Sequence, residues 1–341
     1  MKIKQNISLA SYSTMGLGGK TEYLASIGAK EDLIEALSFA REHRLRTLMI
    51  GGGSNIIWRD EGFKGLVLLN NIRGFEVENE NNDGADIIIG AGEKWDSVVD
   101  RAVSLGLSGI ECLSLIPGSA GATPVQNVGA YGQEISESLV SLVAYDKKAG
   151  SFLTMVNEDC DFSYRNSCFK QEQGRYFILS IRLHLKKSPI KMPIYKSLDK
   201  YLADNNITDT SPKTIRQAVI DIRQAKLPDP NVIKNCGSFF KNPIITNDQF
   251  AKLISKYPDI PHWQMKDGQI KLSAAWLVEN TGFKNYKDSE TGMAIWNKQP
   301  LILINENAKS TSDLLKFKDR IVESVRFKFQ VELIQEPELL P

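Results

Sequence analysis

Two glycine-rich segments, each flanked by apolar residues, constrain the fold of this chain more than any other feature. The first, Gly51–Asn55, lies between the apolar runs 48–50 and 56–57, so we predict a tight link between two strands. Glycine lets backbone N–H groups converge on an anion with no side chain intervening, and Ser54 and Asn55 add side-chain donors. The second, Pro117–Pro124, consists of small residues that permit close approach of a large flat ligand. Together they predict a phosphate-bearing cofactor. The candidate binding residues are Gly51, Gly52, Gly53, Ser54 and Asn55 in the first segment and Pro117, Gly118, Ser119, Gly121 and Ala122 in the second.

Neither segment carries the fingerprint of a known nucleotide-binding loop. Gly51-x-Gly53 lacks the third glycine of the dinucleotide motif at position 56, and no helical pattern follows it. Gly19-Lys20-Thr21 resembles the end of a triphosphate-binding loop, but Thr14 stands where that loop requires its first glycine. We therefore expect neither a dinucleotide-binding motif nor a triphosphate site at these positions.

Short apolar runs alternate with amphipathic helical stripes along the chain. We predict strands at 48–50, 66–69, 87–89, 139–145, 178–185 and 301–304. The helical stripes are Leu33, Ile34, Leu37 and Ala40; Trp95, Val98, Val99, Ala102 and Val103, ended by Gly106; Phe250, Leu253, Ile254 and Tyr257; and Leu314, Phe317, Ile321 and Val325. Proline-rich turns at 188–193 and 227–230 are the candidate boundaries between domains.

Composition excludes several classes of function. With 341 residues, 42% apolar residues and a net charge of +1, the chain is typical of an ordinary globular protein of two or three domains, and no nucleic-acid partner is indicated. The four cysteines form no Cys-x-x-Cys pair and stand near no histidines at zinc spacing, so we expect neither a disulfide framework nor a metal. No apolar run approaches the roughly 20 residues that span a bilayer. We therefore expect a cytoplasmic protein with no membrane segment.

Ser238 is the candidate for chemistry, because it follows Gly237 and precedes two aromatic residues, a cation and an amide. A hydrolytic serine would need a glycine on both sides and a histidine as base, but Phe240 occupies the second glycine position. The chain has three histidines, and His184 lies in a strand-like alternation. Acyl transfer is therefore not expected. A proton donor, a ligand-binding hydroxyl and a plain turn serine stay open at this point.

These motifs, taken together and in order, resemble the UDP-N-acetylenolpyruvoylglucosamine reductase (MurB) family over nearly the whole chain. The matching segments are 11–14, 51–55, 116–121, 126–132, 164–167, 226–230, 237–243 and 336–338. The resemblance implies an α+β protein with a two-subdomain FAD-binding fold of the vanillyl-alcohol-oxidase type and a smaller α+β substrate-binding domain. The implied division is 1–70 for the first FAD-binding subdomain, 71–223 for the second, with 328–341 returning to it, and 224–327 for the substrate-binding domain.

The resemblance also implies a reaction of peptidoglycan precursor synthesis. NADPH would reduce FAD, and a hydride from flavin N5 would add to the vinyl carbon of UDP-N-acetylglucosamine enolpyruvate, giving UDP-N-acetylmuramate. Ser238 matches the proton donor, Arg165 the arginine that contacts the carboxylate, and Glu338 the active-site glutamate, which would carry or share a proton. The expected partners are therefore small molecules, and we expect a monomer.

Further contacts follow from the same resemblance. Gln126 and Arg223 are assigned to the cofactor, and Tyr131, Tyr195, Lys226, Asn242, Trp263 and Gln299 to the substrate. Tyr195 ends the segment Met192-Pro193-Ile194-Tyr195, which matches the loop that covers the substrate in one subclass of the family. Two positions depart from the family pattern, since Trp263 replaces an expected tyrosine and Leu340 an expected arginine.

Two other functions stay open at the level of sequence. An FAD-dependent oxidase on the same scaffold would keep both glycine-rich segments, although the segment 237–243 argues against it. A non-catalytic UDP-sugar-binding protein would bind the nucleotide sugar without converting it, and the departure at Leu340 favours this alternative.

Overall fold

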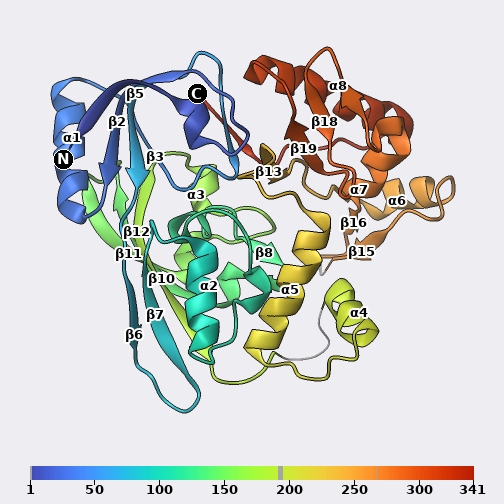
Figure 1. Cartoon of the computed structure of the whole chain (residues 1–341), viewed down its shortest axis with the longest axis horizontal. Helices are drawn as coiled ribbons and strands as arrows, with labels where there is room; N and C mark the ends of the chain where they lie inside the picture. The colour runs from blue at the N-terminus through green and yellow to red at the C-terminus, as the bar shows by residue number, and fades with distance from the viewer. Residues whose placement is uncertain (1, 191–194, 266) are drawn as a thin grey trace. The chain divides into compact units, whose positions relative to one another are not determined.

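The computed structural model describes residues 2–190, 195–265 and 267–341 (Figure 1). The chain divides into two compact units. Unit 1 comprises Met1–Ile7, Thr21–Gly52 and Phe63–Ala225, and unit 2 comprises Ser8–Lys20, Gly53–Gly62 and Lys226–Pro341. The first glycine-rich segment is thus shared between the units, with Gly51 and Gly52 in unit 1 and Gly53 in unit 2.

The first sheet of unit 1 has the strand order β1-β2-β5-β3. These strands are β1 (Ile3–Ser8), β2 (Lys20–Ile27), β3 (Thr47–Ile50) and β5 (Phe63–Asn70), and α1 (Lys30–Glu42) connects β2 to β3. β5 is parallel to both β2 and β3, so α1 is a crossover helix. Leu33 and Ala40 of the predicted stripe are buried, whereas Ile34 is 52% exposed. The helix predicted here and the strands at 48–50 and 66–69 are confirmed.

The second sheet of unit 1 has the order β11-β10-β12-β7-β6, and every neighbouring pair is antiparallel. Its strands are β6 (Phe75–Glu78), β7 (Gly84–Gly90), β10 (Leu139–Asp146), β11 (Ser151–Val156) and β12 (Tyr176–Lys186). The predicted helix α2 (Trp95–Ser104) shares its core. Two helices that the sequence analysis did not predict, α4 (Lys196–Asp204) and α5 (Pro212–Lys226), share another cluster of buried residues. The remaining elements of unit 1 are η2 (Glu111–Leu113), η3 (Ala120–Ala122), β8 (Gly129–Ala130), β9 (Gln133–Glu134), η4 (Ile135–Glu137), η5 (Asn157–Cys160) and α3 (Cys168–Gln171).

Unit 2 contains a four-stranded antiparallel sheet of order β13-β19-β18-β17 and a three-stranded sheet of order β14-β16-β15. The strands are β13 (Asn235–Ser238), β14 (Ile244–Ile245), β15 (His262–Gln264), β16 (Ile270–Leu272), β17 (Lys287–Asp288), β18 (Met293–Ile295) and β19 (Ile302–Asn305). The helical elements are η1 (Leu9–Tyr12), α6 (Asn247–Ile254), α7 (Ala274–Val278), the π-helical turn η6 (Glu279–Phe283) and α8 (Thr311–Phe329).

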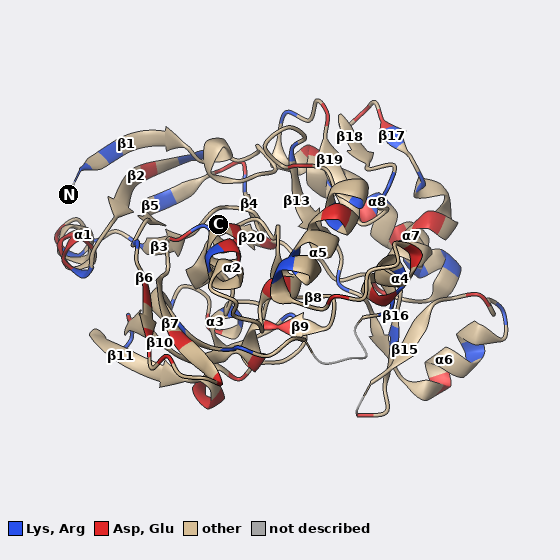
Figure 2. Cartoon of the chain, turned by 60° about the horizontal axis from the view of Figure 1, so that its bottom comes forward, with Lys and Arg blue, Asp and Glu red and all other residues tan. Residues whose placement is uncertain are grey.

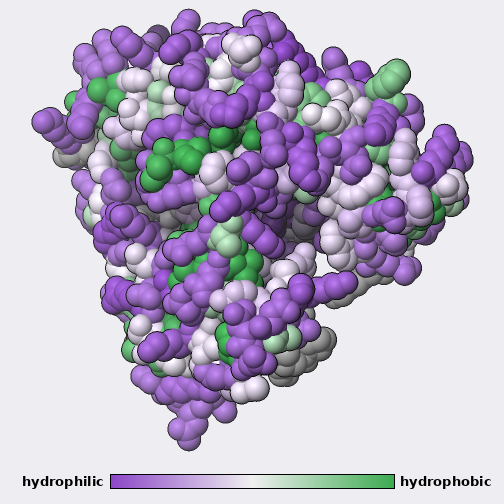
Figure 3. All heavy atoms as spheres, turned by 45° about the vertical axis from the view of Figure 1, so that its right-hand side comes forward, coloured by the Kyte–Doolittle hydropathy of each residue, from purple (hydrophilic) through white to green (hydrophobic). Residues whose placement is uncertain are grey.

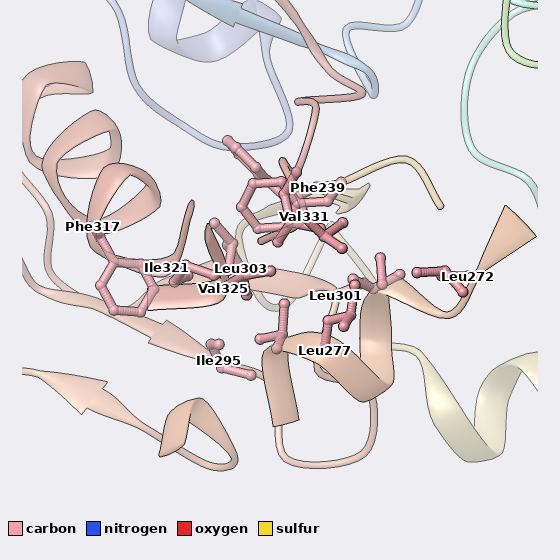
Figure 4. Packing of buried hydrophobic residues seen from close by; sticks show 14 of the residues in the cluster. Phe239, Leu272, Leu277, Ile295, Leu301, Leu303, Phe317, Ile321, Val325 and Val331 are labelled. Atoms are coloured by element: carbon pink, nitrogen blue, oxygen red, sulfur yellow. The ribbon is translucent and has the colours of Figure 1, made fainter. Parts of the chain in front are cut away.

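Helix α8 supplies much of the core of unit 2. Phe317, Ile321 and Val325 lie on one face of this helix and pack with Leu303 of β19 (Figure 4). Each of these side chains is fully buried, and burying one such side chain contributes about 1.5–3 kcal/mol. The helical stripe and the buried strand predicted for this region are confirmed.

The end of the chain is held in a short two-stranded sheet. β20 (Glu338–Leu340) runs parallel to β4 (Ile56–Trp58). The N–H of Glu338 donates to the carbonyl of Asn55 at 2.9 Å, and the N–H of Arg59 donates to that of Leu340 at 3.2 Å. The last strand of the segment 328–341 thus pairs with 56–58 in unit 2, and the return of this segment to 71–223 stays a prediction. The boundaries at 70 and 223 stay predictions.

In the described part of the chain, no helix is long and apolar enough to cross a membrane. The face drawn in Figure 3 is mainly hydrophilic, with small hydrophobic patches between the polar residues.

Candidate active site

The two glycine-rich segments meet in unit 1. A Cβ atom on Gly51 would lie 2.1 Å from Oγ of Ser119, and one on Gly52 would lie 3.0 Å from Cα of Gly118. A side chain on Gly51 would force Ser119 to move, and one on Gly52 would require the backbone at Gly118 to give by a few tenths of an ångström. Segments 68 residues apart in sequence thus form one surface of closely packed backbone, which fits a ligand that needs close contact with N–H groups.

The second segment is fixed by the residues that follow β7. The N–H of Ala120 donates to Glu93 at 2.9 Å, and that of Gly121 donates to Ala91 at 2.8 Å. Ser119 is buried, whereas Pro117 and Ala122 are exposed. The backbone of this loop is therefore anchored at its centre while its ends face outward.

Gly53, Ser54 and Asn55 lie in unit 2, where they lead into β4. Gly53 has a φ of +70°, and a Cβ there would lie 2.3 Å from the carbonyl oxygen of Tyr12. Its own carbonyl accepts from the N–H of Thr14 at 3.0 Å. The motifs 11–14 and 51–55, which are far apart in the sequence, are therefore in direct contact at Gly53.

Arg223, Tyr131 and Tyr195 form a group in unit 1. Nη2 of Arg223, on α5, donates to the carbonyl of Leu115 at 3.4 Å, while its Nε is buried and has no partner among the described residues. Burial lowers the pKa of Arg223 and raises that of Tyr131, while the charge of Arg223 opposes the rise at Tyr131. The ring of Tyr195 meets the ring of Tyr131 edge-on, with centroids 6.1 Å apart. Residues 192–194, the rest of the predicted substrate-covering loop, lie outside the described residues.

Arg165 is presented by a tight turn in unit 1. Its φ is +55°, a conformation that is unfavourable for a residue with a side chain. Nη2 donates to the carbonyl of Gly129 at 2.9 Å, and the guanidinium carbon lies 5.3 Å from the centroid of the Tyr164 ring. Asn127 accompanies this turn, since its Nδ2 donates to the carbonyl of Ser163. Arg165 and the motif 126–132 are thus brought together, and Gln126 lies half-buried in that motif.

Ser238 ends strand β13 in unit 2, opposite Ile302 of β19. Phe239 and Phe240 are buried, and their rings pack against each other with centroids 5.4 Å apart. The N–H of Phe239 donates to Leu301, and its carbonyl accepts from Glu336. Ser238 is half-buried, and within the described ranges its hydroxyl has no hydrogen-bond partner. The strand and the two aromatic anchors therefore fix the serine while its hydroxyl stays available to a ligand.

The other predicted substrate residues of unit 2 fall into two groups. The carbonyl of Lys226, at the end of α5, accepts from Nε1 of Trp296 at 2.9 Å, and the N–H of Gln299, between β18 and β19, donates to the Trp296 carbonyl, so both residues contact Trp296. Asn242 accepts from the N–H of Ala274 at the start of α7. Trp263 is 41% exposed on β15, beneath the ammonium group of Lys271.

Glu338 and Leu340 occupy alternate positions of β20. Glu338 is half-buried, whereas Leu340 is 4% exposed. Position 340, where the family pattern suggested a cation, is therefore a packing position in this chain.

Three residues near the candidate site were not predicted from the sequence: Asp96 and Arg216, which bond to each other beside Leu115, and Trp296, which contacts Lys226 and Gln299. Nη1 of Arg216 on α5 lies 2.6 Å from Asp96 on α2, and Figure 2 shows charged residues along both helices. A charged residue beside the apolar positions Ile215 and Val219 was the available signal, because a buried arginine requires an acidic partner. The position of Trp296 had no comparable signal.

The residues of unit 1 fit a diphosphate-bearing cofactor. The glycine surface admits close approach, and the unpartnered Nε of Arg223 is a buried donor suited to a phosphate oxygen. Among the described residues, no group of His, Cys, Asp and Glu side chains has the arrangement of a metal site.

Comparison with known proteins identifies this cofactor and the family. Residues 21–155 match the family model described as FAD binding domain, and residues 229–340 match the model described as UDP-N-acetylenolpyruvoylglucosamine reductase, C-terminal domain. Proteins named UDP-N-acetylenolpyruvoylglucosamine reductase from Amoebophilus asiaticus and Pseudomonas fluorescens are 40% and 36% identical to this chain. The alignment with the Amoebophilus protein covers 99% of this chain and 99% of that relative, and the alignment with the Pseudomonas protein covers 99% of this chain and 98% of that relative.

A solved structure supports the same fold. The UDP-N-acetylenolpyruvylglucosamine reductase (MurB) of Thermus caldophilus aligns over 100% of both chains with a TM-score of 0.67 and 22% identity. The predicted α+β class, with an FAD-binding domain followed by a family-specific C-terminal domain, is thereby confirmed. The chain is an FAD-dependent oxidoreductase that belongs to the UDP-N-acetylenolpyruvoylglucosamine reductase (MurB) family.

Proposed function

We propose that this chain reduces the enolpyruvyl ether of UDP-N-acetylglucosamine to the lactyl ether of UDP-N-acetylmuramate, with NADPH as the reductant. The observation that carries the proposal is identity of 36–40% over 99% of the chain to proteins that bear the name of this reductase. When bound, FAD accepts electrons from NADPH and supplies the hydride that the double bond requires. Neither the oxidase nor the non-catalytic alternative has a comparable observation in its favour.

Ser238 is the proposed proton donor to the carbon that bears the ether oxygen. Serine is a weak acid in water, so donation requires an acceptor with carbanion character and a site that excludes water. The buried rings of Phe239 and Phe240 support this role, because they hold the serine backbone in place with apolar groups. The hydroxyl would hold its proton at Oγ until the intermediate takes it.

Arg165 and Glu338 are the proposed partners of the substrate carboxylate. A guanidinium is permanently charged and offers a planar fork of donors, so Arg165 suits the negative charge that develops on this group. Its strained backbone and its bond to the Gly129 carbonyl give it a defined orientation. Glu338 is the proposed site of a shared proton, and its pairing with β4 keeps the end of the chain from fraying.

The remaining assignments belong to the same proposal. Tyr131, Tyr195, Lys226, Asn242, Trp263 and Gln299 are the proposed substrate contacts. We also propose the division at 70 and 223 into two FAD-binding subdomains and a substrate-binding domain, a monomeric state, and a cytoplasmic role in cell-wall synthesis that supports cell shape and division.

The test is NADPH oxidation by the FAD-loaded protein under anaerobic conditions, with and without UDP-N-acetylglucosamine enolpyruvate. We expect turnover that requires the sugar. Ser238→Ala should keep reduction of the flavin by NADPH but lose about 10²–10⁴-fold in product formation. Ser255→Ala is the matched control and should retain full activity, because Ser255 follows the end of α6 and its exposed hydroxyl donates only to the Lys252 carbonyl in the described structure.

Different failures identify different errors. Wild-type protein that binds FAD but shows no sugar-dependent turnover would overturn the proposed reaction. Normal product formation by Ser238→Ala would overturn the assignment of the proton donor alone. Glu338→Gln that leaves turnover intact would remove Glu338 from the proposed site.

A further inference from the structure

The second glycine-rich segment is preceded by a residue whose backbone conformation is unfavourable for its side chain. Leu115 has a φ of +58°, in the left-handed region where a leucine side chain is unfavourable. It stands two residues before Pro117 and three before Gly118, whose Cα would contact a Cβ on Gly52. The path of the loop toward the glycine surface therefore depends on what holds Leu115.

Both backbone polar groups of Leu115 are held by side chains of flanking helices. Its N–H donates to Oδ1 of Asp96 on α2 at 2.6 Å. Its carbonyl accepts from Nη2 of Arg223 on α5 at 3.4 Å. Hydrogen bonds to charged groups are stronger than neutral ones, so these contacts offset the unfavourable backbone conformation.

Asp96 is itself fixed by Arg216. Nη1 and Nη2 of Arg216 donate to the two carboxylate oxygens of Asp96 at 2.6 and 3.1 Å, and its Nε donates to Asp100 at 3.1 Å. The side chain of Arg216 is 11% exposed and that of Asp96 is 35% exposed, so the pair joins α2 to α5 in a partly buried setting. Burial would raise the pKa of Asp96, but the bonds from Arg216 and from the Leu115 N–H lower it below its usual value. Asp96 is therefore a charged acceptor with a fixed orientation.

We infer that Asp96 is a positioning residue for FAD: clamped by Arg216, it holds Leu115 and so sets the path of the segment Pro117–Ala122. Asp96 acts through the loop and contacts no reacting atom. The inference rests on the proposed assignment of this segment to the cofactor.

The experiment compares Asp96→Ala with Asp100→Ala. Asp100 contacts the same arginine but not Leu115, and its side chain is 65% exposed, so it is the matched control. The dissociation constant of FAD is measured by flavin fluorescence titration of apoprotein, and the unfolding temperature of the apoprotein is recorded for each variant. We expect FAD affinity to fall about tenfold or more in Asp96→Ala, the size expected for one charge-assisted hydrogen bond, and to change less than about twofold in Asp100→Ala.

A rescue separates positioning from general destabilisation. Glycine adopts a positive φ without strain, so Leu115→Gly should restore part of the FAD affinity lost in Asp96→Ala, whatever its effect on the unfolding temperature. Should Asp96→Ala not fold, Asp96→Asn takes its place, because it preserves the shape of the side chain while removing its charge.

Unchanged FAD affinity in Asp96→Ala, or no recovery with Leu115→Gly, would overturn the inference. An error in the proposed location of FAD would give a different result. In that case Gly51→Ala and Gly52→Ala would also bind FAD with the same affinity as the wild-type protein.

Discussion

The contact between the two glycine-rich segments predicts a specific failure in Gly51→Ala. The new Cβ would lie 2.1 Å from Oγ of Ser119, 3.3 Å from Cβ of Ser119 and 3.7 Å from Cβ of Ala122. Gly51 does not require a positive φ, so the cost comes from the collision alone. Ser119 is 6% exposed, which leaves its hydroxyl little room to move. Overpacking of this kind costs about 1–3 kcal/mol.

That cost converts into FAD affinity if the two segments hold the cofactor. Because about 1.4 kcal/mol corresponds to a factor of ten, we expect Gly51→Ala to weaken FAD binding by roughly 10- to 100-fold. Ser119→Ala removes the colliding atom and leaves contacts of 3.3 Å or longer. The double variant should therefore bind FAD better than Gly51→Ala, with a coupling free energy of about 1–2 kcal/mol. Flavin fluorescence titration of all four apoproteins measures the cycle.

Gly106→Ala is a control that separates the effect of a steric collision from the effect of backbone strain. Gly106 has a φ of +73°, and a Cβ added to it would have nothing within 4 Å, so Gly106→Ala strains the backbone without a clash. We expect it to lower the free energy of unfolding by about 1 kcal/mol and to leave FAD affinity unchanged. Wild-type affinity in Gly51→Ala, or a double variant that binds FAD no better than Gly51→Ala, would refute the reasoning.

Two further predictions concern unit 2. Asp60 accepts from the N–H groups of Thr311 and Ser312 at the start of α8. Burial raises the pKa of Asp60, but the hydrogen bonds from Ser312 and Thr311 outweigh it, so the pKa lies below its usual value. Asp60→Asn should therefore lower the free energy of unfolding, measured with urea at pH 7, by about 0.5–1 kcal/mol. As the pH falls below about 4, Asp60 of the wild-type protein becomes protonated and loses its contribution, so the difference between the two proteins should vanish. A difference that stays constant with pH would contradict this prediction. Leu340→Arg should lower the free energy of unfolding by more than about 2 kcal/mol, since position 340 is buried, whereas a stable variant with a lower KM for the sugar substrate would show that this position faces the substrate.

The regular elements with clear apolar periodicity were predictable from the sequence. The stripe of α8 and the strands β5, β7, β10 and β12 appear where periodicity predicts them, because one buried face determines each. Helix α5 was not predicted, although Ile215, Val219 and Ile222 have helical spacing. Arg216 interrupts that apolar face, and because its partner Asp96 lies 120 residues away, the local pattern does not identify the residue that pairs with it.

The candidate site was predictable only as separate motifs. Local sequence indicated both glycine-rich segments, but not that Gly51 packs on Ser119 or that Gly53 packs on Tyr12. Such contacts depend on strand order, which periodicity does not specify. For the same reason the sequence suggested a missing cation at position 340, whereas pairing with β4 makes that position part of the core.

Backbone conformation gives an independent argument for the location of the site in unit 1. Among the described residues, most non-glycine residues with positive φ are Asn or Asp, which tolerate this region, and Arg44 and Gln330 follow the ends of α1 and α8. The remaining three are Leu115, Tyr131 and Arg165. Each of the three lies in a turn that places it in the left-handed region, yet none is a residue type that tolerates this conformation, and such strain concentrates at functional sites. All three lie in or beside the motifs assigned to FAD and substrate. The residues whose type does not suit their backbone conformation therefore lie where we propose that the chemistry takes place.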